Sequence, residues 1–179
     1  MTSIKDVAKE LKRGKVVLLS TDCGWGIVAS LKGNDVLDKL AEKFISLKSS
    51  EAVILINEVG FVVDLVKDVP EIALTLLDIS ETPLTIQLEK WDETPALMPF
   101  FTNGIFFRKS MDETIILLIH ELRDSLLFIP LLGDNFADIE SSAVSFADIV
   151  METNSRVRTK LVSGLLKFDK RGAFKVIRE

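Results

Sequence analysis

The chain contains few of the side chains that most often carry chemistry. Among its 179 residues there is one cysteine, Cys23, and one histidine, His120. A single cysteine cannot form a disulfide within the chain, so a reducing, cytoplasmic setting is the default expectation. One cysteine, one histidine and scattered carboxylates also show no metal-ligand spacing, and we therefore predict no metal site.

Long apolar runs and the commonest phosphate-binding motifs are missing as well. The apolar segments "IILLI" and "SLLFIPLL" are bounded by charges or proline, and they are far shorter than the ~20 residues of a membrane span. The N-terminal segment is charged and amphipathic, without the apolar core of a secretory signal. There is no GxxxxGK[ST] loop and no GxGxxG before a helix. We therefore expect no membrane partner. We also expect neither of these two phosphate-binding loops.

What the chain does have is ample apolar content and an uneven distribution of charge. Hydrophobic residues make up 47%, which together with the length suits one domain spanning 1–179. The formal net charge is −5, yet residues 156–179 carry +6 and the preceding residues −11. This asymmetry marks either a surface for an anionic partner or the solvated basic face of a C-terminal strand pair. The candidate RNA-contacting residues in it are Arg156, Arg158, Lys160, Lys170 and Arg171.

The order of apolar patterns alternates between helix and strand. Helical periodicity and caps predict helices over 3–13, 34–44, 59–66, 70–77 and 112–123. Short apolar or alternating runs predict strands over 16–19, 27–31, 52–56, 84–90, 104–109, 126–129 and 146–151. Two more strands are expected around the turn Lys170-Arg171-Gly172. The first half of the sequence therefore predicts strands connected by crossover helices, and its end predicts a hairpin. Together they predict an α/β fold: a single domain with a twisted, mixed parallel and antiparallel sheet flanked by helices.

The segment "KVVLLSTDCGWGIVAS", residues 15–30, is unusual in its polar centre. Between two apolar stretches it holds two glycines, a tryptophan, the only cysteine and three side chains that can form hydrogen bonds. It is either a site or a bend between two strands. We expect Trp25 to fill the core rather than to stack on a base. A Cys23–His120 nucleophilic pair stays open, although no third group is evident to orient it, and His120 fits a structural role better.

This segment resembles the YrdC-like family, which comprises threonylcarbamoyl-AMP synthases of tRNA threonylcarbamoyladenosine modification and proteins described as translation factors. The family pattern is G-x-[VI]-[VI]-x-x-P-T-[DE]-T-x-[YFW]-G-[LI]. "RGKVVLLSTDCGWGIVAS" matches it at Thr21, Asp22, Trp25, Gly26 and Ile27. The segment departs from the family at two positions, with serine at 20 in place of proline and cysteine at 23 in place of threonine or serine.

Further segments resemble the family in the same order. "ETPLTIQLEK" is similar to its GPxTxxL strand, "GIFFRK" to its VxVRxP strand, and "SGLLKFDKRGAFKVIRE" to its final STVVDxxG segment. In "LLGDNFAD", where the family has its SxSANxSG loop, only Asn135 matches. The resemblance implies binding of L-threonine and ATP, with Mg²⁺ if synthase activity is retained, and tRNA or double-stranded RNA as a partner. The implied substrate- or nucleotide-binding residues are Thr21, Asp22, Cys23, Lys48, Arg108, Asn135, Ser163 and Arg178.

The departures from the family concern its positive charges. The family motif K-x-R-x-x-x-K-[PG] aligns with Ile45, Leu47 and Glu51, leaving Lys48 nearby, and the SxSANxSG loop keeps only Asn135. Because phosphate binding rests on fixed positive charge, the sequence predicts a degenerate member with no catalytic residue, which retains RNA or nucleotide binding with little or no synthase activity. Two alternatives stay open: an active divergent synthase, and a non-catalytic structural or protein-interaction domain. The oligomeric state stays open too.

Overall fold

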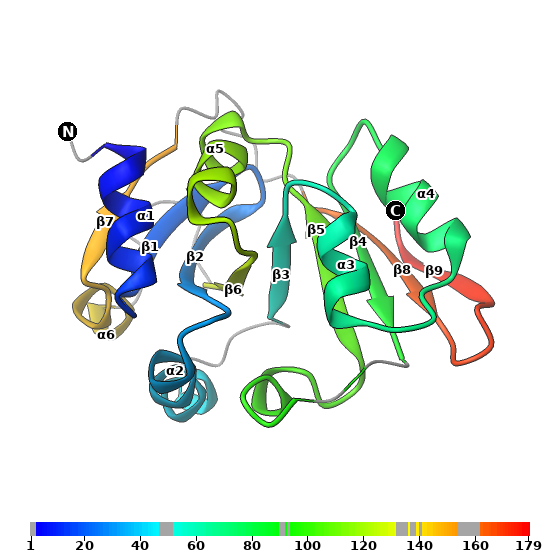
Figure 1. Ribbon diagram of the computed structural model, residues 1–179, viewed down its shortest axis with the longest axis horizontal. Helices are drawn as coiled ribbons and strands as arrows, with labels where there is room; N and C mark the ends of the chain where they lie inside the picture. The colour runs from blue at the N-terminus through cyan, green and yellow to red at the C-terminus, as the bar shows by residue number, and fades with distance from the viewer. Residues whose placement is uncertain are drawn as a thin grey trace.

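Nine strands hydrogen-bond into one sheet in the computed structural model, in the order β7-β1-β2-β6-β3-β5-β4-β8-β9 (Figure 1). The strands are β1 (Val17–Thr21), β2 (Gly24–Ser30), β3 (Val53–Ile56), β4 (Leu84–Leu88), β5 (Ile105–Lys109), β6 (Leu126–Pro130), β7 (Ile149–Met151), β8 (Gly164–Phe168) and β9 (Phe174–Arg178). The structure describes residues 3–46, 52–89, 92, 94–131, 136, 139, 141–153 and 162–179.

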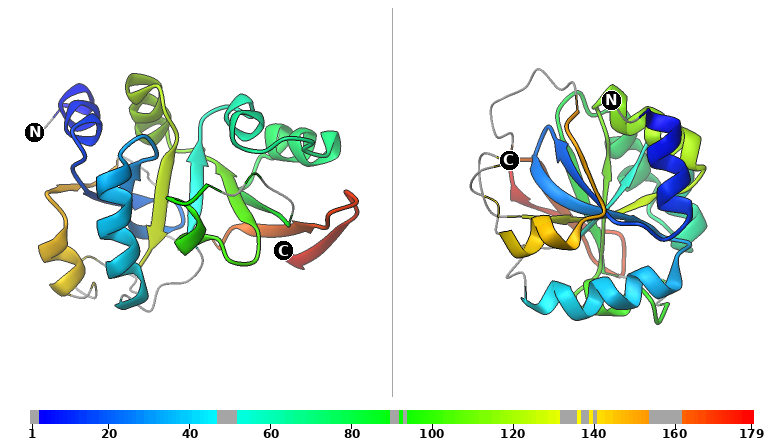
Figure 2. Two further views of the ribbon diagram at one scale, coloured as in Figure 1. Left: turned by 60° about the horizontal axis from the view of Figure 1, so that its bottom comes forward. Right: turned by 90° about the vertical axis from the view of Figure 1, so that its left-hand side faces the viewer.

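The sheet is mixed, and helices flank it on both sides. The pairs β1–β7, β3–β5 and β4–β8 are parallel, whereas the other five neighbouring pairs are antiparallel. Figure 2 shows α1, α3, α4 and α5 on one side and α2, η1 and α6 on the other. The predicted α/β class is confirmed. The helices are α1 (Ile4–Lys12), α2 (Asn34–Ser46), α3 (Gly60–Leu65), α4 (Glu71–Ile79), η1 (Met98–Phe100), α5 (Glu113–Leu122) and α6 (Ser141–Phe146).

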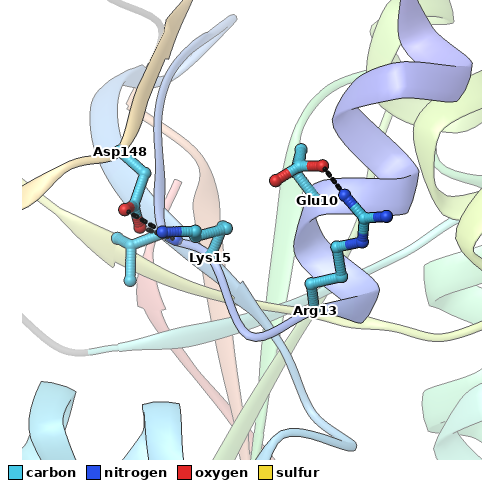
Figure 3. Close-up of polar contacts among 5 residues, drawn as sticks. Glu10, Arg13, Lys15 and Asp148 are labelled. Atoms are coloured by element: carbon cyan, nitrogen blue, oxygen red, sulfur yellow. Dashed lines mark hydrogen bonds and ion pairs between the residues drawn. The ribbon is translucent and has the colours of Figure 1, made fainter.

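Polar contacts fix the ends of several elements. The Ser3 hydroxyl accepts a hydrogen bond from the Asp6 amide and so caps α1, and the Asp112 carboxylate accepts two amide hydrogen bonds at the start of α5. Such caps satisfy amides that have no partner inside the helix. At the sheet edge, Asp148 accepts a hydrogen bond from the Val16 amide at 2.8 Å and pairs with Lys15 at 2.9 Å (Figure 3). This carboxylate therefore joins the entry of β7 to that of β1.

Two of the predicted strands differ from the structure. The strand predicted over 146–151 was wrong in its first half, because Phe146 ends α6 and β7 begins at Ile149. The strand predicted from Ile27 begins at Gly24, because Trp25 and Gly26 pair with β1. Glycine and polar residues lowered the strand signal there, although pairing with a neighbouring strand overrides local preference. Among the described residues, no helix has the length and apolar character needed to cross a membrane.

Candidate functional site

A tight turn joins β1 to β2 and occupies the polar centre of the unusual segment. The Thr21 hydroxyl donates to the Gly24 carbonyl oxygen at 2.8 Å and accepts from the Cys23 amide at 3.1 Å. Gly24 has φ +108°, a region that favours glycine. The segment is therefore a bend between two strands, and the bend holds Asp22 and Cys23 partly exposed at the end of the sheet. The Thr21 hydroxyl closes this turn.

The second glycine of this segment makes room for an aromatic ring. A Cβ atom on Gly26 would lie 2.2 Å from Cε2 of Phe128 and 2.7 Å from the Ile129 carbonyl oxygen, so only glycine fits. On the same side of the sheet, the guanidinium carbon of Arg108 lies 5.3 Å from the centre of the Phe128 ring. This distance is in the range of a cation–π contact. Gly26, Phe128 and Arg108 thus form one stack across β2, β6 and β5.

Strand register places two arginines in one line across the sheet. Arg108 pairs with Thr85, Thr85 with Leu165, and Leu165 with Arg178. We call these four residues the arginine row. Side chains of directly paired residues lie on the same face of a sheet. The next residue, Lys109, faces the other side, where it pairs with Asp78 of α4 at 2.6 Å.

A β-bulge in β9 accounts for the direction of Arg178. Val176 pairs with Leu166 and Arg178 with Leu165, so Ile177 is one extra residue on β9. Without it, alternation would keep Arg178 on the face of Val176, and such bulges commonly re-aim side chains near sites. The Arg178 guanidinium donates to the Ser163 carbonyl oxygen at 2.7 Å and to its hydroxyl at 3.3 Å. That hydroxyl lies 2.9 Å from the Thr85 hydroxyl.

Arg108 differs from Arg178 because its charge is buried and incompletely paired. Only 5% of the residue is exposed, and its Nη2 atom has no hydrogen-bond partner among the described residues. A buried donor without a partner costs roughly 1–3 kcal/mol, more when it is charged. Unpaired buried polar atoms are uncommon in native structures. The Phe128 ring compensates part of this cost, and the free donor provides a contact for an acceptor oxygen of an anionic ligand.

Cys23 lies within the electrostatic reach of this row. Burial raises the pKa of the Cys23 thiol to about 11, from an ordinary 9.0; Asp22 adds to the rise, while Arg108 and Arg178 oppose it. The thiol is therefore protonated at neutral pH and is a poor nucleophile. Register places the β1–β2 turn on the side of the arginine row: Thr21 pairs with Gly24, which shares a face of β2 with Gly26. Gly26 faces the Phe128 ring that contacts Arg108. Together the turn and the arginine row form the candidate site.

The structure brings six of the eight predicted site residues into this region, through direct contacts or electrostatic interaction: Thr21, Asp22, Cys23, Arg108, Ser163 and Arg178. The other two, Lys48 and Asn135, lie outside the described residues, as do the predicted RNA contacts Arg156, Arg158 and Lys160. The remaining RNA candidates, Lys170 and Arg171, lie next to each other in the turn between β8 and β9. Both are exposed to solvent.

The Cys23–His120 pair left open by the sequence is not formed. His120 is exposed in the last turn of α5, which leads into β6 at Leu126. Leu126 pairs with Ser30, at the far end of β2 from Cys23. Seven residues of strand separate those ends by about 20 Å. As expected, Trp25 is buried in the core.

Two residues that matter to this site were not predicted from the sequence. Thr85 lies inside the "ETPLTIQLEK" strand, and it is buried against the Ser163 hydroxyl. Its hydroxyl, in a strand that is otherwise largely apolar, could have marked Thr85 as a candidate. No feature of the sequence marks Phe128, because an aromatic residue in an apolar strand usually belongs to the hydrophobic core. Its contact with Arg108 depends on pairing between distant strands.

Comparison with known proteins supports the fold of this site. No protein-family model and no curated protein sequence matches the chain. Several solved structures do. A variant of P. abyssi Sua5 has a TM-score of 0.78 at 17% identity, over 98% of this chain and 55% of that one. P. abyssi Sua5 complexed with L-threonine has a TM-score of 0.73 at 16% identity, over 92% and 50%.

Two other proteins are similar to this chain. Full-length HypF in a phosphate- and nucleotide-bound form has a TM-score of 0.76 at 18% identity, over 98% of this chain and 24% of its own. E. coli YciO has a TM-score of 0.73 at 13% identity, over 98% and 88%. The chain thus spans about half the length of P. abyssi Sua5 and a quarter of HypF. The structural neighbours are Sua5/YrdC-type proteins, so the resemblance predicted from the sequence is confirmed for the fold.

Proposed function

We propose that this protein is a degenerate relative of the threonylcarbamoyl-AMP synthases, one that binds a nucleotide at the arginine row but makes little or no threonylcarbamoyl-AMP. The observation that carries the proposal is the buried Arg108 guanidinium, whose Nη2 atom has no partner among the described residues. A carboxylate or phosphate oxygen satisfies such a donor best, because charge-assisted hydrogen bonds are the strong ones. The likeness to HypF, solved with phosphate and nucleotide bound, supports an anionic ligand.

The expected loss of synthesis follows from what accompanies Arg108. Residues 45, 47 and 51 are Ile45, Leu47 and Glu51, where the family pattern has three cations. Each charge-assisted hydrogen bond contributes roughly 1.5–3 kcal/mol, so the absence of several weakens ATP binding and removes the charge that stabilises the transition state. Cys23 replaces a hydroxyl of the family and stays protonated at neutral pH. We therefore expect the site to bind a nucleotide but to lack the positive charges that catalysis requires.

We assign no separate binding residues to L-threonine or to Mg²⁺. P. abyssi Sua5 is known complexed with L-threonine, and a free amino acid would present its carboxylate to the same arginine. Mg²⁺ is expected only as the companion of ATP, because it usually keeps several waters and is held by substrate phosphates together with one or two carboxylates. Among the described residues, no group of three or more His, Cys, Asp or Glu side chains forms a candidate metal site.

The test is pyrophosphate release from ATP in the presence of L-threonine and bicarbonate, run beside P. abyssi Sua5. We expect turnover at least about a hundredfold slower than that of the comparison enzyme, because two or more charge-assisted hydrogen bonds to the substrate are absent. ATP binding, measured separately, should persist. Comparable turnover would show an active divergent synthase instead. Absence of both turnover and binding would favour a structural or protein-interaction domain.

RNA binding is the second part of the proposal, and it rests on the basic end of the chain. In the described residues of this end, Lys170 and Arg171 protrude at the β8–β9 turn. A basic surface of this kind binds phosphates without reading sequence, and its affinity falls steeply with salt. We expect weak binding of tRNA or double-stranded RNA that depends on these residues. It is separable from nucleotide binding, because the turn is not part of the arginine row.

A further inference from the structure

Among the residues that the structure describes, the C-terminal strand β9 pairs on one side only, with β8. It is the last strand in the sheet order, and all five of its residues are exposed. Figure 2 shows the β8–β9 hairpin at one end of the sheet, with α4 above it in the left view. An edge strand presents a row of unpaired amides and carbonyls to any other extended chain. This makes β9 a surface on which a further strand can be added.

The exposed side chains of β9 are largely apolar. Phe174 is 49% exposed, Val176 is 51% exposed and Ile177 is 49% exposed. Phe174 packs on the buried Phe168, with ring centres 5.3 Å apart, so it is held in place while half of its surface faces solvent. Phe174 and Val176 share one face of β9, and Ile177 follows them at the bulge. Apolar residues grouped in this way mark interaction sites more often than single exposed residues do.

Charge indicates which partner suits this edge. Lys175 lies opposite Lys167, which is already paired with Glu89 at 2.9 Å. Lys175 has no ion-pair partner among the described residues, whereas Lys170 and Arg171 lie outside β9, in the turn to which we assign RNA binding. The nearby Asp169 carboxylate accepts hydrogen bonds from the Arg171 and Ala173 amides through its Oδ1 atom and forms no ion pair with Lys175. The hairpin therefore offers unpaired positive charge beside its exposed apolar residues.

We propose that β9 is a docking edge for an extended acidic peptide segment of a partner protein, which adds a tenth strand to the sheet. Main-chain hydrogen bonds to β9 supply the general affinity, and alternate side chains supply the selectivity. Apolar residues of the peptide cover Phe174 and Val176 on one face. Acidic residues meet Lys175 on the other face. The bulge at Ile177 limits regular pairing to the first part of β9.

The same features disfavour two other occupants. Antiparallel pairing of β9 with a second copy of this chain would bring two sets of unpaired cations together. Lysine on an edge strand and a bulge are both devices that prevent self-pairing. RNA bound at the β8–β9 turn would use Lys170 and Arg171 but would leave Val176, Ile177 and the backbone of the β9 edge without a role, because single strands are held by phosphate contacts and aromatic stacking. The acidic peptide uses all of these features.

The experiment titrates the full chain into a fluorescein-labelled peptide of four Glu-Val repeats and follows fluorescence anisotropy. Lys175→Glu is expected to weaken binding by about tenfold or more, because attraction to the acidic side chains becomes repulsion. Val176→Glu should weaken it by a similar factor, because a charge replaces the apolar contact with the peptide valines. The matched control is Val150→Glu on β7, the opposite edge strand, where Val150 is similarly exposed; it should leave binding unchanged. All three substitutions lie at exposed positions, and melting curves verify that the variants are folded.

Two further readouts make the proposal falsifiable. Hydrogen exchange of the amides of residues 174–178 should slow when the peptide is added, which a purely ionic contact would not cause. A peptide in which proline replaces two valines should bind much more weakly, because it cannot complete the pairing. Equal binding by wild type, Val176→Glu and Val150→Glu would overturn the proposal. So would dimers in sedimentation that Val176→Glu abolishes, or binding of duplex RNA but not of the peptide at this edge.

Discussion

The guanidinium of Arg108 rests on the ring of Phe128, with its central carbon 5.3 Å from the ring centre. The ring in turn occupies the space that a side chain at Gly26 would need. A charge at 5% exposure is costly unless it is compensated. The Phe128 ring compensates part of the cost of burying this charge. A hydrogen bond from Nη2 to an anionic ligand would compensate the rest. The site is therefore held by packing between strands that are distant in the sequence.

Gly26→Ala tests this packing. The added methyl group would collide with Phe128 and with the Ile129 carbonyl, so we expect a decrease of roughly 1–3 kcal/mol in the free energy of unfolding. The displaced ring should also move Arg108 and weaken ATP binding. Urea denaturation and calorimetry measure the two effects. Gly60→Ala is the matched control, because a Cβ at Gly60 meets nothing within 4 Å; an equal effect at both glycines would contradict the account.

The Cys23 thiol gives a prediction about pH. Because burial raises its pKa to about 11, alkylation by iodoacetamide at pH 8 should be roughly a hundredfold slower than that of a free cysteine. The Cys23 thiol keeps its proton up to a higher pH in the folded protein than in the unfolded chain. The stability that this provides is complete below about pH 9 and is lost as the pH rises towards 11. Cys23→Ala should flatten this decline, whereas an alkylation midpoint near 8.5 would refute the prediction.

For Asp148 we predict a pH dependence of stability opposite to that of Cys23: its contribution is lost as the pH falls. Burial favours its protonated form, but the hydrogen bond from Val16 and the contact with Lys15 outweigh burial and hold the pKa of Asp148 below its ordinary 3.8. Its stabilisation is therefore present above pH 3.8 and is lost as the pH falls through the lower, folded value. Asp148→Asn should lower the free energy of unfolding by about 1 kcal/mol at pH 7.

Urea denaturation of Asp148→Asn and wild type at pH 7 and at pH 3 measures this effect. The difference between the two proteins should shrink at the lower pH. Asp64→Asn, on the exposed surface of α3, serves as the control and should show little change. A difference that stays constant with pH would mean that the carboxylate charge does not link β7 to β1.

RNA binding by the basic end can be tested with charge reversals. Duplex RNA should bind weakly, and the affinity should fall steeply between low and physiological salt. Lys170→Glu/Arg171→Glu should flatten the log–log salt dependence by about one unit for each phosphate that the protein no longer neutralises. Arg156→Glu/Arg158→Glu tests the other cations of the basic end of the sequence in the same way. Identical salt curves for wild type and both variants would show that this end of the chain is only a solvated surface.

Much of this architecture could be predicted from the sequence, because local patterns determine it. The helices predicted over 3–13 and 112–123, the alternating strands and the C-terminal hairpin all follow from sequence patterns, and the structure contains them. The strand predicted over 146–151 failed in its first half. Phe146 belongs to a short helix there, and a brief apolar run does not distinguish strand from helix.

The site could be predicted as a set of residues but not as an arrangement. Thr21, Arg108, Ser163 and Arg178 carried motif signals, yet the order in which strands pair determines that they lie on one face. The bulge at Ile177, which turns Arg178 to that face, is a single extra residue visible only in the register. The role of Gly26 likewise depends on Phe128, about a hundred positions later, and no local pattern records such a contact.

The most direct test of the central claim is calorimetric titration of ATP into wild type, Arg108→Met and Lys109→Met. Methionine keeps the length and packing of position 108 but removes its charge, so the variant should fold. Lys109 is the neighbouring cation of the same strand and faces α4, which makes it the matched control. We predict that ATP binds wild type and Lys109→Met alike, and binds Arg108→Met roughly tenfold to a hundredfold more weakly. Equal ATP affinity for all three proteins would contradict the account, because Arg108 would then not anchor the ligand.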